Sequence, residues 1–263
     1  MKVLFIADAH LRFRNDHGYR MLMDFLGCLR GKGTCQGKSE GQEDGFRQGG
    51  GQIAGIDDLY ILGDFFDFWF SEGTSIYPEF KDVVAALAEL KERGIRVHLC
   101  EGNHDFFLAD YFARHLGLEV IRDWATINLD GRRVLISHGD TVDSGNKKYL
   151  LLRKLLRSSF FYRLQRVMPV AILWRVARVS SHLSKELTEE TADALALKMR
   201  LFARRKFRDD FDAVILGHTH HHLVEECNVN GSKKTLALLG DWVRHYSYLC
   251  YENGEFTLAN FRS

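Results

Sequence analysis

Five short polar clusters in this sequence carry side chains that bind divalent metals, and each cluster follows an apolar run. In chain order they are Asp8-Ala-His10, Gly63-Asp64-Phe-Phe-Asp67, Gly102-Asn103-His104-Asp105, Ser137-His138-Gly139-Asp140 and Gly217-His218-Thr-His220. Carboxylates, imidazoles and an amide oxygen suit Mn²⁺, Fe²⁺ or Zn²⁺, and the absence of cysteine disfavours a structural zinc site. A lone Asp or His after a strand is usually a cap or a surface residue, but a series of five is hard to obtain that way. The pattern predicts a hydrolytic centre with two metal ions.

The elements that must position these clusters are strands. Apolar runs rich in Val, Ile and Leu precede them at 2–7, 58–62, 95–100, 132–136 and 212–216. Strand ends can bring loop residues together at one edge of a sheet, although these residues lie far apart in the sequence. Residues i and i+2 of an extended segment point to the same side, so each Asp-x-His or His-x-His pair could reach one centre.

Helical patterns separate several of the strand-like runs. Residues 77–93 and 106–116 have apolar residues at helical spacing, so we expect sheets covered by helices, an α/β fold. From Leu223 onward, strand-like segments and turn signals predict hairpins that complete a second sheet.

Two segments interrupt this pattern within a single domain of residues 1–263. Residues 31–55 are rich in glycine and glutamine with almost no apolar content, which predicts a flexible loop. Residues 147–208 are helical in pattern and interrupt the strand series, so we interpret them as an inserted cap or lid.

Composition limits the class of protein. A formal net charge of +1 does not by itself predict a polyanionic partner. The five scattered cysteines argue against a disulfide framework and favour a reducing compartment. The apolar run at the N-terminus stops at Asp8, too early for a signal peptide, and residues 167–174 are too short an apolar stretch to span a bilayer. We therefore expect a cytoplasmic protein that does not cross a membrane.

The order of the motifs resembles that of the calcineurin-like metallophosphoesterases: D-x-H, G-D-x-x-D, G-N-H-D, H-G and G-H-x-H, over nearly the whole chain. This resemblance implies a four-layer αββα sandwich with two divalent ions. One ion is then bound by Asp8, His10, Asp64 and His220. The other is bound by Asp64, Asn103, His138 and His218, so that Asp64 bridges the two.

Hydrolysis of a phosphoester follows from such a centre. Two ions ~4 Å apart lower the pKa of a bridging water and contact both the attacking and the leaving oxygens. In the family the histidine of G-N-H-D, here His104, stabilises or protonates the leaving group, and Asp105 could orient its ring. The alternative is that His104 donates hydrogen bonds without transferring a proton. Asp67 is expected to support the ligands, and His221 and His222 to be bystanders.

The predicted insertion is strongly basic and apolar. Residues 147–178 contain nine Lys or Arg and no Asp or Glu, interleaved with aromatic and aliphatic residues. Such a segment suits an anionic membrane surface or a lipid phosphate. The alternative is a helix pair packed on the body of the protein with a solvated basic face.

Three segments look like the UDP-2,3-diacylglucosamine hydrolases of lipid A biosynthesis: residues 63–70, 102–107, and 138–141 followed by Tyr149 and Arg153. The resemblance implies attack at the α-phosphorus, giving UMP and diacylglucosamine 1-phosphate. It also implies a preference for Mn²⁺ and a place on the cytoplasmic face of a Gram-negative inner membrane. The expected substrate-binding residues are Asn146, Tyr149, Arg153 and Arg157.

Two departures from that branch keep other substrates open. His104 stands where the branch has arginine, and the glycine-rich segment is additional. The main alternative is a metallophosphoesterase for a nucleotide phosphodiester or a phosphoprotein. The abundant aliphatic residues of the basic segment disfavour a nuclease, so we expect no nucleic-acid partner. The presence of all seven ligands disfavours a non-enzymatic scaffold. The sequence leaves the oligomeric state open.

Overall fold

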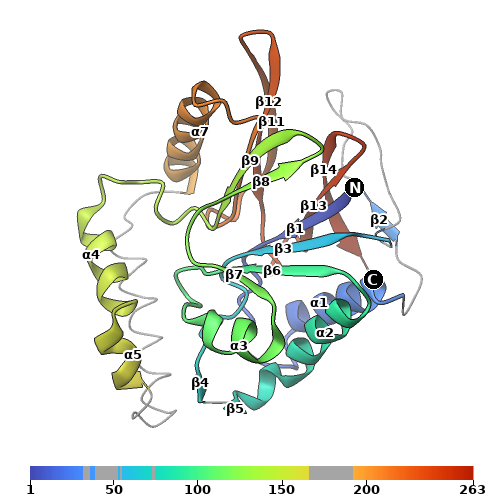
Figure 1. Ribbon diagram of the computed structural model, residues 1–263, viewed down its shortest axis with the longest axis vertical. Helices are drawn as coiled ribbons and strands as arrows, with labels where there is room; N and C mark the ends of the chain where they lie inside the picture. The colour runs from blue at the N-terminus through green and yellow to red at the C-terminus, as the bar shows by residue number, and fades with distance from the viewer. Residues whose placement is uncertain (32–35, 39–52, 54, 73–74, 166–191, 263) are drawn as a thin grey trace.

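The computed structural model describes residues 1–31, 36–38, 53, 55–72, 75–165 and 192–262. Its two main sheets pack face to face with helices on their outer faces (Figure 1). The strands of the first sheet, in spatial order, are β2 (Gln36–Lys38), β14 (Glu255–Arg262), β13 (Ser247–Glu252), β1 (Lys2–Ile6), β3 (Asp58–Leu62), β6 (Arg96–Cys100) and β7 (Glu119–Ile121). Those of the second are β11 (His222–Val229), β12 (Ser232–Leu239), β10 (Ala213–Leu216), β9 (Arg132–Ser137) and β8 (Ala125–Leu129). A short ribbon pairs β4 (Ser71–Glu72) with β5 (Ser75–Ile76).

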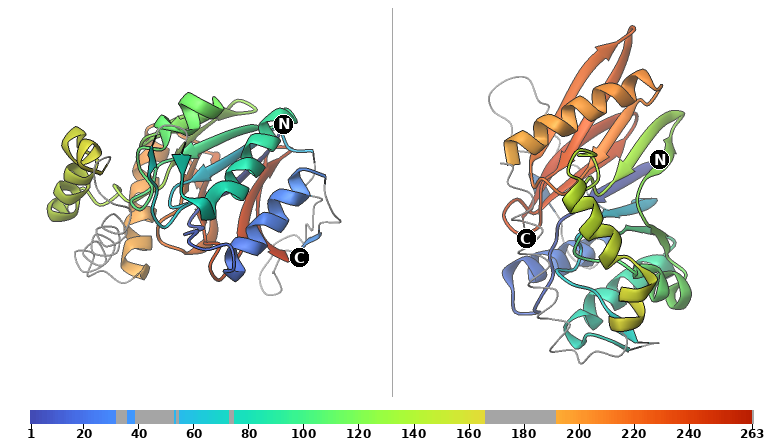
Figure 2. Two further views of the ribbon diagram at one scale, coloured as in Figure 1. Left: turned by 90° about the horizontal axis from the view of Figure 1, so that it is seen from below. Right: turned by 90° about the vertical axis from the view of Figure 1, so that its left-hand side faces the viewer.

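Helices make the outer layers, as two further views show (Figure 2). The helices of the described residues are α1 (His17–Leu29), α2 (Lys81–Glu92), α3 (Phe112–Leu116), α4 (Lys147–Leu156), α5 (Ser159–Gln165) and α7 (Ala192–Arg208), with 3-10 turns η1 (Pro78–Phe80) and η2 (Leu108–Asp110). Helices α1, α2 and α3 cover the first sheet, and α7 covers the second. The predicted four-layer αββα sandwich is confirmed.

Alternation along the central strands generates these layers. In β1, Leu4 and Ile6 belong to the core shared with α1 and α2, whereas Val3 and Phe5 belong to the core between the sheets. Successive side chains of a strand point to opposite faces, so a fully apolar strand must be covered on both sides. The apolar run at residues 2–6 is therefore buried on both faces, by helices on one side and by the second sheet on the other.

Four strands of the first sheet and three of the second run parallel and bring their carboxyl ends to one edge. In the first sheet β1 pairs in parallel with β3, β3 with β6, and β6 with β7. In the second sheet β10 pairs in parallel with β9 and with β12. The five polar clusters follow five of these seven strands, so the predicted convergence at a sheet edge is confirmed.

The C-terminal hairpins are divided between the sheets, which corrects the expectation that they complete the second one. The hairpin of β11 and β12 does join the second sheet. That of β13 and β14 instead extends the first, where Val3 pairs with Tyr251. Leu249 and Tyr251 of β13 are fully buried between the sheets, and this burial favours the observed pairing.

The predicted insertion at 147–208 is not uniform in the described residues. Helix α7 packs on the second sheet, where Ala196, Met199 and Phe207 contact its outer face. This helix is therefore a layer of the sandwich. Helices α4 and α5 lie along one side of the sandwich (Figure 1). Residues 166–191, and most of the glycine-rich segment, lie outside the described residues.

Among the described residues, no helix is long and apolar enough to cross a membrane. Cys28 at the end of α1 is disulfide-bonded, so scattered spacing did not exclude a disulfide. Cys100, Cys227 and Cys250 are free thiols.

Candidate metal centre

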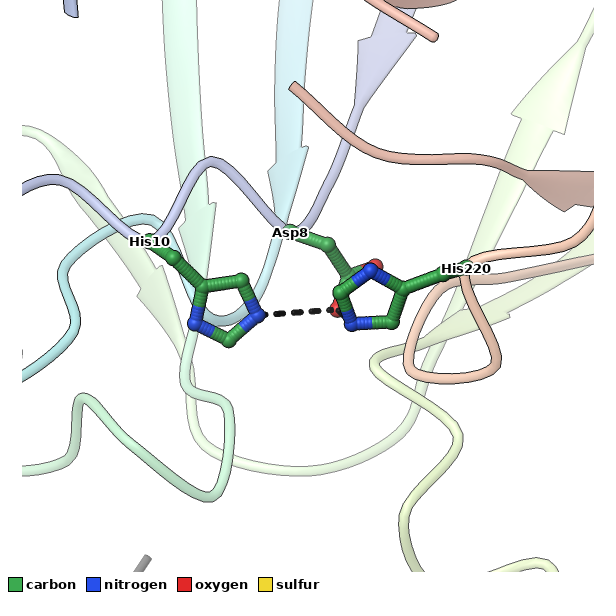
Figure 3. Close-up of side chains that lie close together, drawn as sticks. All are labelled: Asp8, His10 and His220. Atoms are coloured by element: carbon green, nitrogen blue, oxygen red, sulfur yellow. Dashed lines mark ion pairs between the residues drawn. The ribbon is translucent and has the colours of Figure 1, made fainter. Parts of the chain in front are cut away.

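The first candidate metal-binding group consists of Asp8, His10 and His220 (Figure 3). The Nε2 atoms of His10 and His220 lie 3.9 Å and 3.7 Å from Oδ1 of Asp8. Both Asp8 Oδ1 and His10 Nε2 are buried, and neither has a hydrogen-bond partner in the described part of the chain. Burying polar atoms without partners is costly. A divalent cation shared by these three side chains would satisfy them, so the residues fit a metal ion.

The second group consists of Asp64, His138 and His218, and Asn103 lies beside it. Nδ1 of His138 donates to the Leu62 carbonyl at 3.0 Å, which fixes the ring. Its Nε2 atom therefore faces Oδ2 of Asp64 at 3.4 Å and Oδ1 of Asn103 at 3.0 Å. A backbone carbonyl behind a metal-binding imidazole sets the tautomer in this way in many proteins.

The backbone at these ligands is not extended, contrary to the expectation for the Asp-x-His and His-x-His pairs. The five residues with left-handed backbone here are Asp8 (φ 55°), His10 (φ 45°), Asp64 (φ 49°), His218 (φ 70°) and His220 (φ 57°). Left-handed geometry is unfavourable for residues with a Cβ and is found most often at functional sites. The side chains of each pair belong to this centre because the chain turns sharply after β1 and β10.

Glycines make room for this close approach. A Cβ on Gly102 would overlap the backbone and carboxylate of Asp64. A Cβ on Gly63 would lie 2.6 Å from Nδ1 of His138, and Gly63 also has φ +84°. Only glycine meets both demands without displacing a ligand.

The side chain of Asp105 binds backbone N–H groups, whereas the residue in contact with the ring of His104 is Asp67. The buried carboxylate of Asp105 accepts four backbone N–H groups at 2.7–3.1 Å, from Asp64, Phe65, Phe66 and Gly102. Nδ1 of His104 instead donates to the Asp67 carbonyl at 3.2 Å. The expected orientation of the ring by Asp105 is therefore wrong, because its oxygens are engaged by the turn that carries Asp64.

One residue that belongs to this centre was missed from the sequence. Asp241 follows β12, and its Oδ2 atom lies 3.1 Å from Nδ1 of His220. Its Oδ1 atom accepts backbone N–H groups from Val243, Arg244 and His245. The apolar run of β12 followed by Gly240-Asp241 is the same signal that marked the other clusters. It was overlooked because this region was interpreted only as hairpins.

The charges of the second group are strongly coupled. Burial alone would raise the pKa of Asp64, but the imidazoles around it, His138 foremost, hold that pKa well below its usual value. Burial opposes the imidazolium of His138, yet the carboxylates of Asp64 and Asp8 raise its pKa to about 10. Burial lowers the pKa of His218 to about 4. A metal ion bound here must replace the proton on His138, because only neutral imidazole is a ligand.

The residues expected to bind substrate lie on and before α4. Asn146 accepts the N–H of Tyr149 and caps the helix. The hydroxyl of Tyr149 donates to Asp140 at 2.8 Å, and Nε of Arg153 donates to the same oxygen at 2.6 Å. Arg157, one turn further on, pairs with Glu101 at 3.0 Å. Three of these four residues thus contact the loops of the centre.

The arrangement of two carboxylate and imidazole groups at the edge of an αββα sandwich defines a class of protein. Residues 1–222 match the family model described as calcineurin-like phosphoesterase, and the chain belongs to this family. Calcineurin-like phosphoesterases use divalent metals, and the chain is accordingly a metal-dependent hydrolase of phosphoester bonds.

Several proteins similar to this chain have more specific names. A protein of Ectopseudomonas mendocina named UDP-2,3-diacylglucosamine hydrolase is 32% identical over 204 residues, 77% of this chain and 84% of its own length. A protein of the same name from Photorhabdus laumondii is 28% identical over 262 residues, 99% of each chain. A solved structure described as a novel archaeal phosphodiesterase covers 98% of each chain with 13% identity and a TM-score of 0.45.

Proposed function

We propose that this protein hydrolyses the pyrophosphate bond of UDP-2,3-diacylglucosamine to give UMP and diacylglucosamine 1-phosphate. The observation that carries the hydrolytic part is the pair of candidate metal-binding groups at the sheet edges, the first of which has buried ligand atoms without a hydrogen-bond partner in the described part of the chain. The choice of substrate is supported by relatives with that name over most of the chain.

The two groups would hold one ion each, with Mn²⁺ as the preferred metal. Asp64 is suited to bridge them, because its Oδ2 atom lies 3.9 Å from His10 Nε2 and 3.4 Å from His138 Nε2. Asn103 would complete the second set and His220 the first. When bound, the ions would stabilise charge on the phosphoryl oxygens and lower the pKa of a water molecule.

His104 would act on the leaving group. Its Nδ1 proton is held by the Asp67 carbonyl, so its Nε2 atom faces the centre, 4.0 Å from Oδ2 of Asp64. Burial lowers the pKa of His104, which makes its protonated form a stronger acid. A histidine in this position can stabilise or protonate a departing phosphate oxygen.

Helices α4 and α5 supply a surface for acyl chains and for anionic headgroups. Leu151 (70% exposed), Leu155 (58%) and Phe160 (71%) present large apolar side chains. Exposed Lys154 lies between the two leucines. Apolar side chains beside cations suit the boundary between headgroups and acyl chains. We therefore propose that the protein binds peripherally to the cytoplasmic face of the inner membrane, with α4 and α5 as a lid over the lipid.

The test is turnover of UDP-diacylglucosamine in detergent micelles by the full chain reconstituted with Mn²⁺, run in ¹⁸O-labelled water. We expect UMP as a product, with the label in UMP, because attack at the α-phosphorus leaves the new oxygen there. Asp64→Ala is the control, and it should be inactive. Turnover of soluble diesters with an inert lipid substrate would contradict the choice of substrate and leave the hydrolytic proposal standing.

His104 favours one second candidate, a phosphoesterase for a nucleotide phosphodiester or a phosphoprotein. Histidine at this position matches the general pattern of the family rather than that of the lipid branch, which has arginine there. Profiling the same Mn²⁺-loaded protein on nucleotide diesters and phosphopeptides distinguishes the two candidates.

A further inference from the structure

Two arginines of helix α4 and its C-terminal cap form hydrogen bonds and ion pairs with the two loops that carry Asn103 and His138. Arg157 reaches the loop after β6: its Nη1 atom donates to Glu101 at 3.0 Å and its Nη2 atom to the Gly102 carbonyl at 2.7 Å. Glu101 is buried and lies two residues before Asn103. Its other carboxylate oxygen accepts the N–H of Leu108 at 3.0 Å, so it spans the loop.

Arg153 reaches the loop after β9 from the same face of the helix. It donates from Nε to Asp140 at 2.6 Å, and Asp140 lies two residues after His138. The carboxylate of Asp140 is 1% exposed, and the side chains of Arg153 and Arg157 are each only 14% exposed. Residues four apart on a helix share one face, so Arg153 and Arg157 contact both loops from the same face of the helix.

The two loops follow strands of different sheets, and their candidate ligand residues lie next to each other. Asn103 follows a strand of the first sheet and His138 a strand of the second, and their ligand atoms lie 3.0 Å apart. Arg157 also donates to the Arg122 carbonyl after β7 at 2.9 Å, which adds a third attachment. We call these contacts of Arg153 and Arg157 with the two loops the brace. Because the brace joins loops of both sheets, it fixes the distance between Asn103 and His138.

We propose that Arg153 and Arg157 are positioning residues that set the affinity of the second centre for its metal ion. They act through Asp140 and Glu101 and do not touch the ion. The inference rests on the proposed function, since it requires Asn103 and His138 to be ligands. Residues behind metal ligands typically change metal affinity by about 10–100-fold when they are substituted.

The direction in which metal affinity changes on replacing an arginine distinguishes a positioning role from a purely electrostatic one. Arg157→Gln removes a positive charge from the neighbourhood of a cation site, so Coulomb's law alone predicts tighter metal binding. Loss of the brace predicts weaker binding. Lys154→Gln is the matched control, because it removes the same charge from an exposed position of the same helix.

The experiment is calorimetric titration of the metal-free full chain with Mn²⁺. The step that disappears in Asn103→Ala identifies the second centre. We expect Arg157→Gln to weaken this step by about 10–100-fold and to leave the first step and the control variant unchanged. If Arg157→Gln does not fold, as judged by near-UV circular dichroism, Arg153→Gln carries the test with the same expectation.

Three results would overturn the inference: an unchanged or tighter second step, a weakening smaller than expected, or an equal loss in both steps. The last would mean that the arginines only stabilise the fold. A wild-type protein that binds no second ion would instead contradict the proposed metal centre, so the two failures are distinguishable.

Discussion

Asp241 makes its contribution to the centre through a neighbour. It is buried, it lies beside Nδ1 of His220, and its other oxygen ties down the turn that follows β12. Burial alone would raise the pKa of Asp241, but the His220 contact and the backbone donors lower it. A charged carboxylate in this position fixes the ring so that Nε2 points towards Asp8.

Replacing Asp241 by Asn should therefore weaken Mn²⁺ binding about 10–100-fold. An amide can still accept backbone N–H groups, but its NH₂ cannot accept the proton of His220 Nδ1. Calorimetric titration measures the change in dissociation constant. Asp193→Asn is the control, because Asp193 pairs with the neighbouring His221 at 3.0 Å and is largely exposed. Equal effects of both variants would refute the role of Asp241.

His104→Gln should lower kcat about 100-fold while the bound metal, measured by atomic emission, stays at the wild-type content. If His104 protonates the leaving group, the loss grows as the leaving group becomes more basic, as a series of aryl esters of UMP would reveal. A loss of the same size across the series would mean that His104 donates only hydrogen bonds.

At the scale of residues, the sequence indicated the side chains of the candidate metal-binding groups but not the residues that support them. Asp8 and His138 stood out because polar residues after apolar runs are easy to recognise. The contacts of Glu101 and Asp140 with α4 join segments 56 and 13 residues apart. Such partners depend on how helices dock, which no local pattern encodes.

Helix α7 illustrates how an element acquires its role from packing. Met199 is fully buried against the outer face of the second sheet. Met199→Ala should reduce the free energy of unfolding by about 3 kcal/mol, as large-to-small changes in cores do. Urea denaturation measures this loss. Leu201→Ala on the same helix, where the side chain is 51% exposed, should cost less than about 0.5 kcal/mol. Similar losses for the two variants would contradict the assignment of α7 to the sandwich.

At the scale of elements, the strands before the clusters were predicted almost to the residue, whereas their partners were not. The run at 58–62 became β3 with the same bounds. The pairing of β13 with β1 joins the two ends of the chain, and local turn signals say nothing about such a contact. Helix α7 was grouped with the insertion because it follows the basic segment, although its apolar face belongs to the second sheet.

Across the whole molecule, acid stability should depend on a cluster remote from the metal centre. Asp58 accepts two hydrogen bonds from Arg96, both at 2.6 Å, and lies 2.9 Å from Nε2 of His98. Burial would raise the pKa of Asp58, but these partners lower it below the usual 3.8. A lowered carboxyl pKa contributes stability that is present above the unfolded value and is lost as pH falls through the folded value.

Asp58→Asn should consequently destabilise the protein at pH 7, by about 1–2 kcal/mol for the lost charged hydrogen bonds, and should flatten the acid limb of the stability profile. Urea unfolding between about pH 5 and pH 2 measures this limb. The difference between the two proteins should shrink as the pH falls. A variant that loses stability as steeply as the wild type would contradict the assignment.

Metal binding should stabilise the folded chain as a whole. At a free Mn²⁺ concentration 100 times the dissociation constant, one bound ion adds about 2.7 kcal/mol to the free energy of unfolding. Urea denaturation with Mn²⁺ and with a chelator gives the difference, and Asp64→Ala should abolish it. Equal stability under both conditions would argue against a metal site that exists only in the folded state.

The candidate ligands come from both sheets, with Asp64 and Asn103 from the first and His138 and His218 from the second. An ion held between them would join the two sheets, so the amount of bound metal would report how well the sheets pack against each other. Tyr251 is fully buried between the sheets and is not a member of any of the three candidate metal-binding groups in the described residues. A genetic screen for metal-poor protein should thus recover substitutions at Tyr251 alongside those at the ligands, and such alleles would be defects of assembly that present as defects of catalysis.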